Sequence, residues 1–311
     1  MTMHRIDVHH HHFPPDYVEA VRQRFIERAS EFSRVLEWTP AAALEAMDRN
    51  GIAKAYLSIA AQNVWFGDAK ESRRLSRLCN DYATQLSRDH PGRFGVFAAL
   101  PLPDKEGSLE EIRYAFDVLG ADGVGLVTSY DGVYPGDKRF APVFDELNRR
   151  KAVVFVHPTS CAACRNLVPE VTPAMMEYPV DTTRAIGSLL YSGTFARCPD
   201  IRFIFCHGGG VLPMLAHRIA NQVNVRPQLK PTVPNGVFHE LKKLYYEVNN
   251  AANPPGFSAL RNLVPMSQIL FGSDNPYVKP AHTIEGLQSL GLDTRDLLAI
   301  ERDNALALFQ K

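Results

Sequence analysis

Short runs of apolar residues recur along the chain and alternate with longer segments in which the apolar positions repeat at helical spacing. Runs that are apolar at nearly every position are typical of strands buried on both faces of a parallel sheet. The pattern predicts eight strands, which are expected within 5–13 and at 53–59, 94–100, 123–127, 152–156, 201–206, 244–248 and 268–271.

The segments between these runs predict helices. One helix is expected to begin with Asp16 as its capping residue, and another at Thr39, where Pro40 follows as a favourable first helical residue. Ser108 is expected to cap a helix that reaches Leu119.

Strands and helices therefore alternate along the whole chain. This order predicts an α/β fold, a (β/α)₈ TIM barrel, in a single domain that spans residues 1–311. An open doubly wound sheet is the alternative. It is disfavoured because no Gly-x-Gly-x-x-Gly sequence follows the first predicted strand.

Composition and charge narrow the range of partners. The 311 residues are 45% hydrophobic and 22% charged, with 34 Lys and Arg against 34 Asp and Glu. Balanced charge gives no overall field to attract nucleic acid or an anionic membrane surface, so a small molecule is the expected partner. No apolar run approaches the roughly 20 residues of a membrane span, and no signal segment is recognised, which makes the cytoplasm the expected location.

Four consecutive histidines, His9 to His12, end the first predicted strand. Side chains two apart in a strand share a face, so His9 and His11 can bind one ion while His10 points the other way. A purification tag is disfavoured because the run is short and lies between Ile-Asp-Val and Phe-Pro-Pro rather than in a linker. A solvated or core-satisfied histidine cluster stays open on this stretch alone.

Residues of the metal-ligand type also end three other predicted strands. His157 ends the fifth strand, His207 the sixth and Asp274 the eighth. The carboxyl ends of barrel strands meet at one mouth, so these side chains are expected to converge with His9 and His11. Imidazoles and a carboxylate together suit one divalent cation, Zn²⁺ or else Mn²⁺, Fe²⁺ or Co²⁺. The fourth strand ends in Val-Thr-Ser, without a lysine that could be carboxylated to bridge two ions.

Four strand-end motifs resemble those of the amidohydrolase superfamily. They are Asp-Val-His-His-His in the first strand, Val-Phe-Val-His-Pro in the fifth, Phe-Cys-His-Gly-Gly-Gly-x-x-Pro in the sixth and Phe-Gly-Ser-Asp-x-Pro in the eighth. Their order between Ile6 and Pro276 resembles the branch of metal-dependent, O₂-independent decarboxylases. That branch includes aminocarboxymuconate semialdehyde, γ-resorcylate, 5-carboxyvanillate and 6-methylsalicylate decarboxylases.

The resemblance implies roles for individual residues. The implied metal ligands are His9, His11, His157 and Asp274, with Zn²⁺ as the expected ion and Mn²⁺ as the alternative. His207 is then close to the metal-bound water rather than a ligand. Arg218 matches an arginine that in related decarboxylases reaches a neighbouring subunit's active site and holds a substrate carboxylate, so a homodimer or higher homo-oligomer is expected. An ordinary surface arginine is the alternative interpretation.

The resemblance also implies a carboxy-lyase activity. The semialdehyde decarboxylase pattern has an arginine where this chain has Ala43, which weakens the case for that dicarboxylate substrate. A small aromatic acid with an ortho hydroxyl group, or an enol acid, is expected instead, with Phe13 and Trp65 as apolar walls. His207 or Asp274 is expected to protonate the carbon that loses CO₂, and the choice between them stays open.

Two other functions use the same site. A metal-bound water that attacks a carbonyl would make the protein a lactonase or a C–C bond hydrolase, and a non-catalytic metal-binding barrel would lack a proton donor. A Cys-x-x-Cys sequence, Cys161 to Cys164, is interpreted as a coincidence within a loop, because no second pair and no thioredoxin-like pattern accompany it. The five cysteines are expected to be thiols, and Cys206 is expected in the core.

Overall fold

The computed structural model describes residues 4–26, 35, 37–60, 63–159, 161–164 and 167–310, with the backbone alone at 23–26 and 162. In this part of the chain eight parallel strands pair in sequence order. They are β1 (Arg5–His11), β2 (Ile52–Ser58), β3 (Phe94–Ala99), β4 (Gly123–Val127), β5 (Val153–His157), β6 (Arg202–Phe205), β7 (Tyr245–Glu247) and β8 (Ile269–Leu270).

The first and last strands meet along a seam. Val8 N donates to Phe271 O at 3.1 Å, and Asp274 N donates to His9 O at 2.7 Å. These backbone hydrogen bonds bring β1 alongside β8, so the eight strands form a nearly closed barrel. The (β/α)₈ architecture predicted from the sequence is confirmed.

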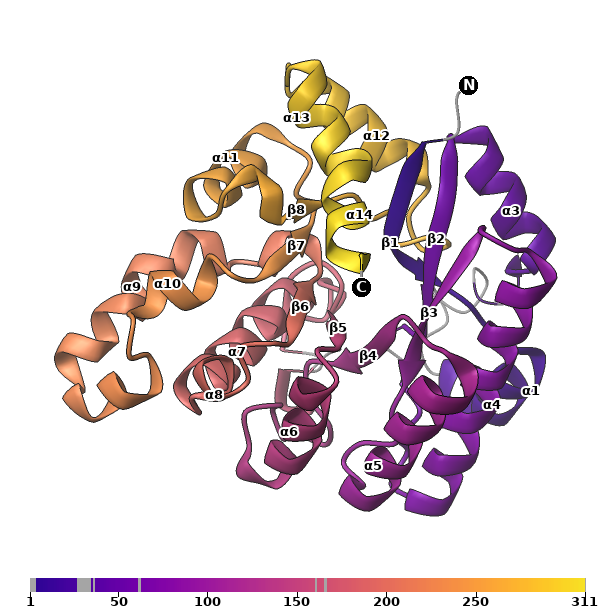
Figure 1. Cartoon of the computed structure of the whole chain (residues 1–311), viewed down its shortest axis with the longest axis horizontal. Helices are drawn as coiled ribbons and strands as arrows, with labels where there is room; N and C mark the ends of the chain where they lie inside the picture. Colours follow the sequence, from indigo (N-terminus) through magenta and orange to yellow (C-terminus); the bar gives the residue numbers. More distant parts are fainter. Residues whose placement is uncertain are drawn as a thin grey trace.

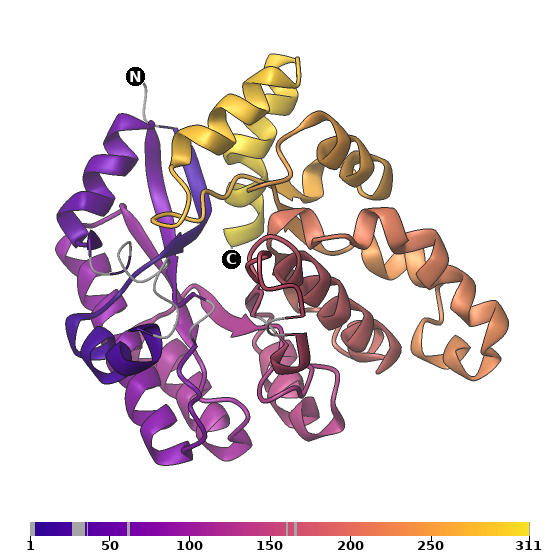
Figure 2. The same cartoon turned by 180° about the vertical axis from the view of Figure 1, so that it is seen from behind.

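Helices surround the strands on the outside of the barrel (Figure 1). The described helices are α1 (Pro15–Ile26), α3 (Pro40–Arg49), α4 (Ala69–Asp89), α5 (Lys105–Tyr114), α6 (Ala141–Arg149), α7 (Glu177–Tyr191), α8 (Thr194–Arg197), α9 (Leu212–Val225), α10 (Val237–Leu241), α11 (Pro254–Leu263), α12 (Pro280–Ser289), α13 (Thr294–Leu298) and α14 (Asn304–Phe309). Seen from behind, α9 and α10 extend away from the ring of strands (Figure 2). None of the helices in the described ranges has the length and apolar character needed to cross a membrane.

Capping side chains begin several helices. Thr39 accepts a hydrogen bond from the first turn of α3, so its predicted role is confirmed. The predicted cap at Ser108 is wrong, because Asp104 caps α5 by accepting from Gly107 N at 3.1 Å. A carboxylate lies one turn earlier than the serine, which therefore falls inside the helix and donates to Asp104 O. The cap predicted at Asp16 is also wrong, since that residue already lies in the first turn of α1.

The barrel interior is filled with apolar side chains. This interior cluster comprises Ile6, Val8, Tyr56, Phe97, Val153, Phe155, Ile204, Cys206, Leu270, Ala305 and Leu308. The C-terminal helix α14 contributes the last two and contacts β1 and β8 (Figure 1). The ring of Phe309 stacks on that of Tyr56 with centroids 3.9 Å apart. Cys206 lies in the core as expected, and the polar site is left to the carboxyl ends of the strands.

Candidate metal and active site

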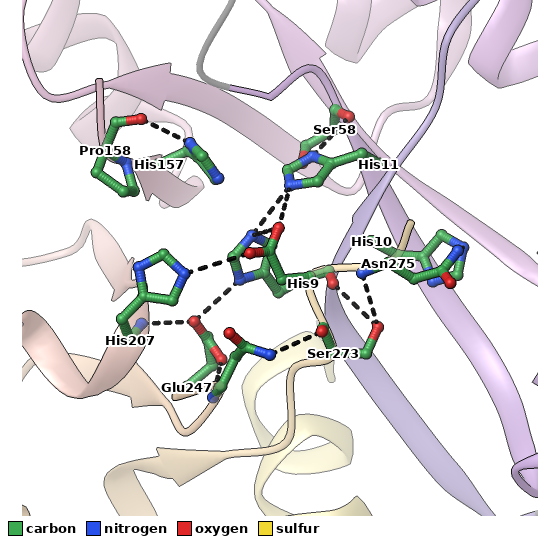
Figure 3. A network of polar contacts seen from close by, with 12 residues as sticks. His9, His10, His11, Ser58, His157, Pro158, His207, Glu247, Ser273 and Asn275 are labelled. Carbon is green, nitrogen blue, oxygen red and sulfur yellow. Dashed lines mark hydrogen bonds and ion pairs between the residues drawn. The ribbon is translucent and has the colours of Figure 1, made fainter. Parts of the chain in front are cut away.

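Four side chains of the metal-ligand type meet where β1, β5 and β8 end (Figure 3). His9 Nε2 and His11 Nε2 lie 3.0 Å apart. Asp274 Oδ1 lies 3.2 Å from His9 Nε2 and 3.0 Å from His11 Nε2. One ring nitrogen of His157 lies within 4.8 Å of the other three atoms. All four side chains are buried, so residues far apart in the sequence share one small, nearly dry space.

Each of the three imidazoles is oriented by an acceptor on its other nitrogen. His9 Nδ1 lies 2.9 Å from Glu247 Oε1, and His157 Nδ1 lies 2.7 Å from the carbonyl oxygen of Pro158. His11 Nδ1 lies 3.2 Å from the carbonyl oxygen of Ser58. A carboxylate or a carbonyl can only accept, so the neutral form of each imidazole carries its proton on Nδ1 and presents a lone pair at Nε2. The three lone pairs converge on the carboxylate of Asp274.

This arrangement fits a metal ion. His157 Nε2 is buried without a hydrogen-bond partner in the described part of the chain, and an unsatisfied buried polar atom costs about 1–3 kcal/mol. The Nε2 lone pairs of His9 and His11 face each other at 3.0 Å, where neither can donate to the other. A divalent cation accepts all three lone pairs and balances the carboxylate, and a nitrogen-rich donor set of this kind is typical of zinc and neighbouring transition metals.

At His157 and Asp274, burial and charge favour the protonation states that a metal site needs, whereas at His9 burial is outweighed by the neighbouring Cys206, Asp274 and Glu247, which raise the pKa of its ring. Burial, reinforced by the nearby His11 and His9, lowers the pKa of His157 well below its ordinary value, so the imidazole is neutral. For Asp274, burial alone would raise the pKa. The charge of the His9 ring, together with the nearby rings of His11 and His207, outweighs burial and holds the pKa of this carboxyl well below its usual range. A neutral imidazole and an ionised carboxylate are both competent ligands.

Glu247, at the end of β7, was not among the site residues expected from the sequence. It is fully buried, and its Oε1 accepts from His9 Nδ1 at 2.9 Å and from His207 N at 2.6 Å. Its Oε2 accepts from Asn249 N at 2.6 Å. A side chain at Gly272 would place its Cβ 2.5 Å from Glu247 Oε2, so glycine is required beside it. Active-site residues of a barrel lie at the carboxyl ends of its strands, and this rule would have identified Glu247 if it had been applied to the seventh strand.

His207 follows β6 and faces the second oxygen of Asp274. Its Nε2 lies 3.5 Å from Asp274 Oδ2, and its side chain is 9% exposed. Both residues have positive φ, 55° for His207 and 61° for Asp274, a conformation that costs a non-glycine residue of order 1 kcal/mol. Asp274 therefore presents Oδ1 to the histidines of β1 and Oδ2 to His207. One carboxylate connects the candidate metal ligands with a candidate proton donor.

The other two histidines of the run serve the surrounding structure. His10 lies between Asp7 and Asn275, with Nδ1 3.1 Å from Asp7 Oδ2 and Nε2 3.1 Å from Asn275 Nδ2. His12 Nε2 lies 3.2 Å from Cys79 O, and burial lowers the pKa of His12 to about 4. His10 therefore points away from the ligand cluster, as the alternation of a strand predicts.

Aromatic rings line the mouth beside the histidines. The ring of Tyr277 lies edge-on to His11 with centroids 5.6 Å apart, and the ring of Tyr178 lies edge-on to His157 at 6.4 Å. Neither tyrosine was predicted, because both follow the strand ends in loops or helix starts without a sequence pattern. Phe13, which was predicted as a wall, is 2% exposed and packs against Tyr277 at 6.0 Å. Trp65 is half-buried and donates through Nε1 to a neighbouring loop.

Arg218 does not belong to the ligand cluster of its own chain. It lies exposed on α9 and forms no hydrogen bond or ion pair with another described residue. Cys161 and Cys164 are both free thiols, and Cys164 Sγ lies 3.9 Å from a nitrogen of Arg184. Among the described residues neither thiol belongs to a group that could hold a metal ion.

Comparison with known proteins adds a family and several relatives. A family model described as Amidohydrolase matches residues 6–311. The decarboxylase yanB of Aspergillus niger is 38% identical over 330 residues, which cover 99% of this chain and 88% of that protein. The 6-methylsalicylic acid decarboxylase of Penicillium expansum is 32% identical and is matched over 88% of this chain and 85% of its own length. A dihydroxybenzoic acid decarboxylase of Polaromonas sp. JS666, crystallised with manganese and the inhibitor 2-nitroresorcinol, has a TM-score of 0.84 and 20% identity, over 99% of this chain and 97% of that one.

Proposed function

This chain belongs to the amidohydrolase family, and from that premise we propose that it is a metal-dependent, nonoxidative carboxy-lyase of a small aromatic acid with an ortho hydroxyl group. The observation that carries the proposal is the convergence of three imidazole lone pairs on Asp274 at the barrel mouth, with His207 against the second oxygen of the same carboxylate. Relatives that are matched over most of this chain are named decarboxylases, in agreement with the resemblance of the strand-end motifs.

We assign the metal ligands to His9, His11, His157 and Asp274. Nitrogen donors in this number, with one oxygen donor, favour Zn²⁺, and the manganese bound by the Polaromonas relative makes Mn²⁺ the alternative. A divalent cation held by these side chains supplies a Lewis acid for the carboxylate and the adjacent hydroxyl oxygen of the substrate. Glu247 and the carbonyl groups behind the three imidazoles keep their Nε2 atoms aimed at that cation.

The reaction requires a proton at the carbon that loses CO₂. When the bond between the ring carbon and the carboxyl group breaks, its electron pair stays on the ring carbon, which must then take up a proton. His207 or Asp274, whose Nε2 and Oδ2 atoms lie 3.5 Å apart, delivers that proton to the ring carbon. Solvent returns a proton to the pair after CO₂ has left. The two side chains are 9% and 11% exposed, which limits competition from bulk water.

The surroundings of the site favour an aromatic acid. Tyr277 lies beside His11 with Phe13 packed behind it, and we propose that these rings and Trp65 form the apolar side of the substrate site. A groove of about 570 Å³ lies between the start of α3 and the loop before α12, and its lining includes the apolar Trp38 and Ala43, Tyr277 and the charged Lys279.

We further propose that the protein acts as a homodimer in which Arg218 holds the carboxylate of a substrate bound by the partner subunit. Arg218 is exposed on α9, a helix that extends from the barrel (Figure 2). Met214, one turn earlier on the same face, is 77% exposed, and Val225 at the end of the helix is 65% exposed. Large apolar side chains beside an unpaired arginine are typical of an interface rather than of a solvated surface.

The test is a panel of ortho-hydroxybenzoates, including salicylate and 6-methylsalicylate, with release of CO₂ measured against consumption of lactones. We expect CO₂ release that depends on a bound divalent ion. His207→Ala should keep the metal content and lower the rate by about 10²–10⁴-fold, the usual contribution of a general acid. His90→Ala is the matched control, because His90 follows α4 and packs on Phe94 at the start of β3, at the end of the barrel opposite the candidate ligands.

Either of two results would reject the proposal. Consumption of a lactone, with no CO₂ released from any acid, would assign the protein to the metal-dependent hydrolases instead. An unchanged rate for His207→Ala would remove that residue from the proton-transfer step.

A further inference from the structure

The two faces of β1 do not alternate in the simple way that its sequence predicts. Ile6 and Val8 belong to the interior cluster of the barrel. In a regular strand the next residues on that face would be at even positions, and His9 and His11 would point outward with Asp7. In the structure the ring of His9 packs instead against Phe155 of the interior cluster, with centroids 5.1 Å apart.

An extra residue in β1 accounts for this change of face. Asp7 pairs with Ala55 of β2, and the next paired residue, His10, is opposite Leu57. Three steps along β1 therefore correspond to two steps along β2, which is a β-bulge. Because one inserted residue reverses the direction of every later side chain, the bulge turns His9 and His11 into the barrel after Val8.

The carboxyl group of Asp7 occupies the bulge. It is fully buried, and its Oδ1 accepts from His9 N at 3.0 Å and from Ser273 N at 2.9 Å. Its Oδ2 accepts from Ser273 Oγ at 2.5 Å and from His10 Nδ1 at 3.1 Å. Four donors thus use the four lone-pair positions of an ionised carboxylate.

These contacts join the two strands that carry candidate ligands. His9 N belongs to β1, whereas Ser273 directly precedes Asp274 after β8. The hydroxyl of Ser273 also accepts from Asn275 N at 3.1 Å (Figure 3). Asp274 N donates to His9 O at 2.7 Å. The side chain of Asp7 therefore gives an acceptor to His9 N within the bulge and to Ser273 N across the seam between β1 and β8.

We propose that Asp7 is a positioning residue of the metal site, which holds the β1 bulge in place and thereby sets the direction of His9 and His11 and their spacing from Asp274. This inference rests on the proposed function, because the direction of His9 and His11 matters only if they bind a metal ion. Asp7 itself touches neither the Nε2 atoms nor the mouth, so it acts through its neighbours.

The test substitutes Asp7→Asn and measures metal binding with Zn²⁺ and Co²⁺ alone, without substrate. Asparagine has the same shape but one oxygen, so it can accept at most two of the four hydrogen bonds and directs an amide N–H₂ at two donors. We expect metal affinity to fall by about 10- to 100-fold, as for other groups that orient ligands, and the visible absorption spectrum of bound Co²⁺ to change. Ser273→Ala removes one of the four donors and should give a smaller change in the same direction.

The controls separate positioning from general destabilisation. Asp122→Asn removes a carboxylate that also accepts a strand amide, Val96 N at 2.9 Å, but away from the site. It should lower the unfolding temperature without altering metal affinity or the Co²⁺ spectrum. If Asp7→Asn cannot be purified in a folded form, the metal affinity and Co²⁺ spectrum of Ser273→Ala test the proposal instead.

Two outcomes distinguish the failure of this inference from the failure of the proposed function. Wild-type affinity and an unchanged Co²⁺ spectrum in Asp7→Asn, with affinity lost in His11→Ala, would overturn the positioning role alone. Unchanged metal binding in His11→Ala would reject the metal site itself.

Discussion

Replacing Glu247 with glutamine should weaken metal binding more than it weakens the fold. The carboxylate accepts two hydrogen bonds on Oε1, from His9 Nδ1 and His207 N, and one on Oε2, from Asn249 N. Glutamine keeps a single acceptor. If its oxygen faces His9, its N–H₂ group meets Asn249 N–H, and one hydrogen bond of about 1.5–3 kcal/mol is lost.

The opposite orientation of the glutamine acts directly on the ligand. Its N–H₂ group then faces His9 Nδ1, which must accept, and the imidazole proton moves to Nε2. A protonated Nε2 cannot bind a metal ion. Each orientation therefore costs free energy in the metal-bound state, and loss of such an orienting partner typically lowers metal affinity about 10- to 100-fold, or about 1.4–2.7 kcal/mol.

The assay is a competition titration of Zn²⁺ between the protein and a chromogenic chelator, with thermal unfolding of the metal-free protein measured in parallel. Glu301→Gln is the matched control. Glu301 is also buried, accepts from Arg5 Nε at 2.8 Å and lies 2.6 Å from His4 Nε2, but at the opposite end of β1. It should lower stability and leave the affinity unchanged. Zn²⁺ affinity of Glu247→Gln within twofold of wild type, or an equal loss in Glu301→Gln, would refute the reasoning.

The remaining predictions concern Arg218 on α9 and the packing of α14 against the barrel. Arg218→Ala should raise KM about tenfold or more while metal content stays constant, because a charge-assisted hydrogen bond to the substrate carboxylate is lost. Co-expression of Arg218→Ala with His207→Ala chains should restore part of the activity if Arg218 acts across the dimer, whereas no recovery would count against a shared site. Phe309→Ala should lower the free energy of unfolding by about 2–3 kcal/mol, because the stack on Tyr56 is lost. This is less than the roughly 3–5 kcal/mol of a fully buried phenylalanine, since Phe309 is only partly buried. Chemical denaturation measures that loss. A changed Zn²⁺ affinity in this variant would show that the packing of α14 affects the metal site.

Much of the fold was predictable because its determinants are local. Continuous apolar runs mark strands that are covered on both faces, and their alternation with helices leaves few architectures. Helix boundaries were less predictable. Asp104 rather than Ser108 caps α5, since two suitable caps lie one turn apart and only the backbone decides which one meets the free N–H groups.

The strand-end residues were identifiable for a similar reason. The carboxyl ends of parallel barrel strands meet at one mouth, so His9, His11, His157, His207 and Asp274 could be grouped from the sequence before any distance was known. Glu247 ends a strand too and was overlooked. Its part in orienting His9 depends on a contact between residues 238 positions apart, which no local pattern encodes.

By itself, the sequence determined the eight-stranded barrel and the set of side chains offered at its mouth, because both follow from periodicity and strand order. Only the tertiary structure decided how those side chains are presented. Simple alternation would place His9 and His11 on the face opposite Ile6 and Val8, and a bulge opposite β2 brings all of them inside. Acceptors on distant residues, Glu247 for His9 and Ser58 for His11, then select the protonated nitrogen of these two imidazoles. A buried polar group must find its partner in three dimensions, so the tautomers, the spacing and the electrostatics of the site depend on packing between strands that the linear order does not specify.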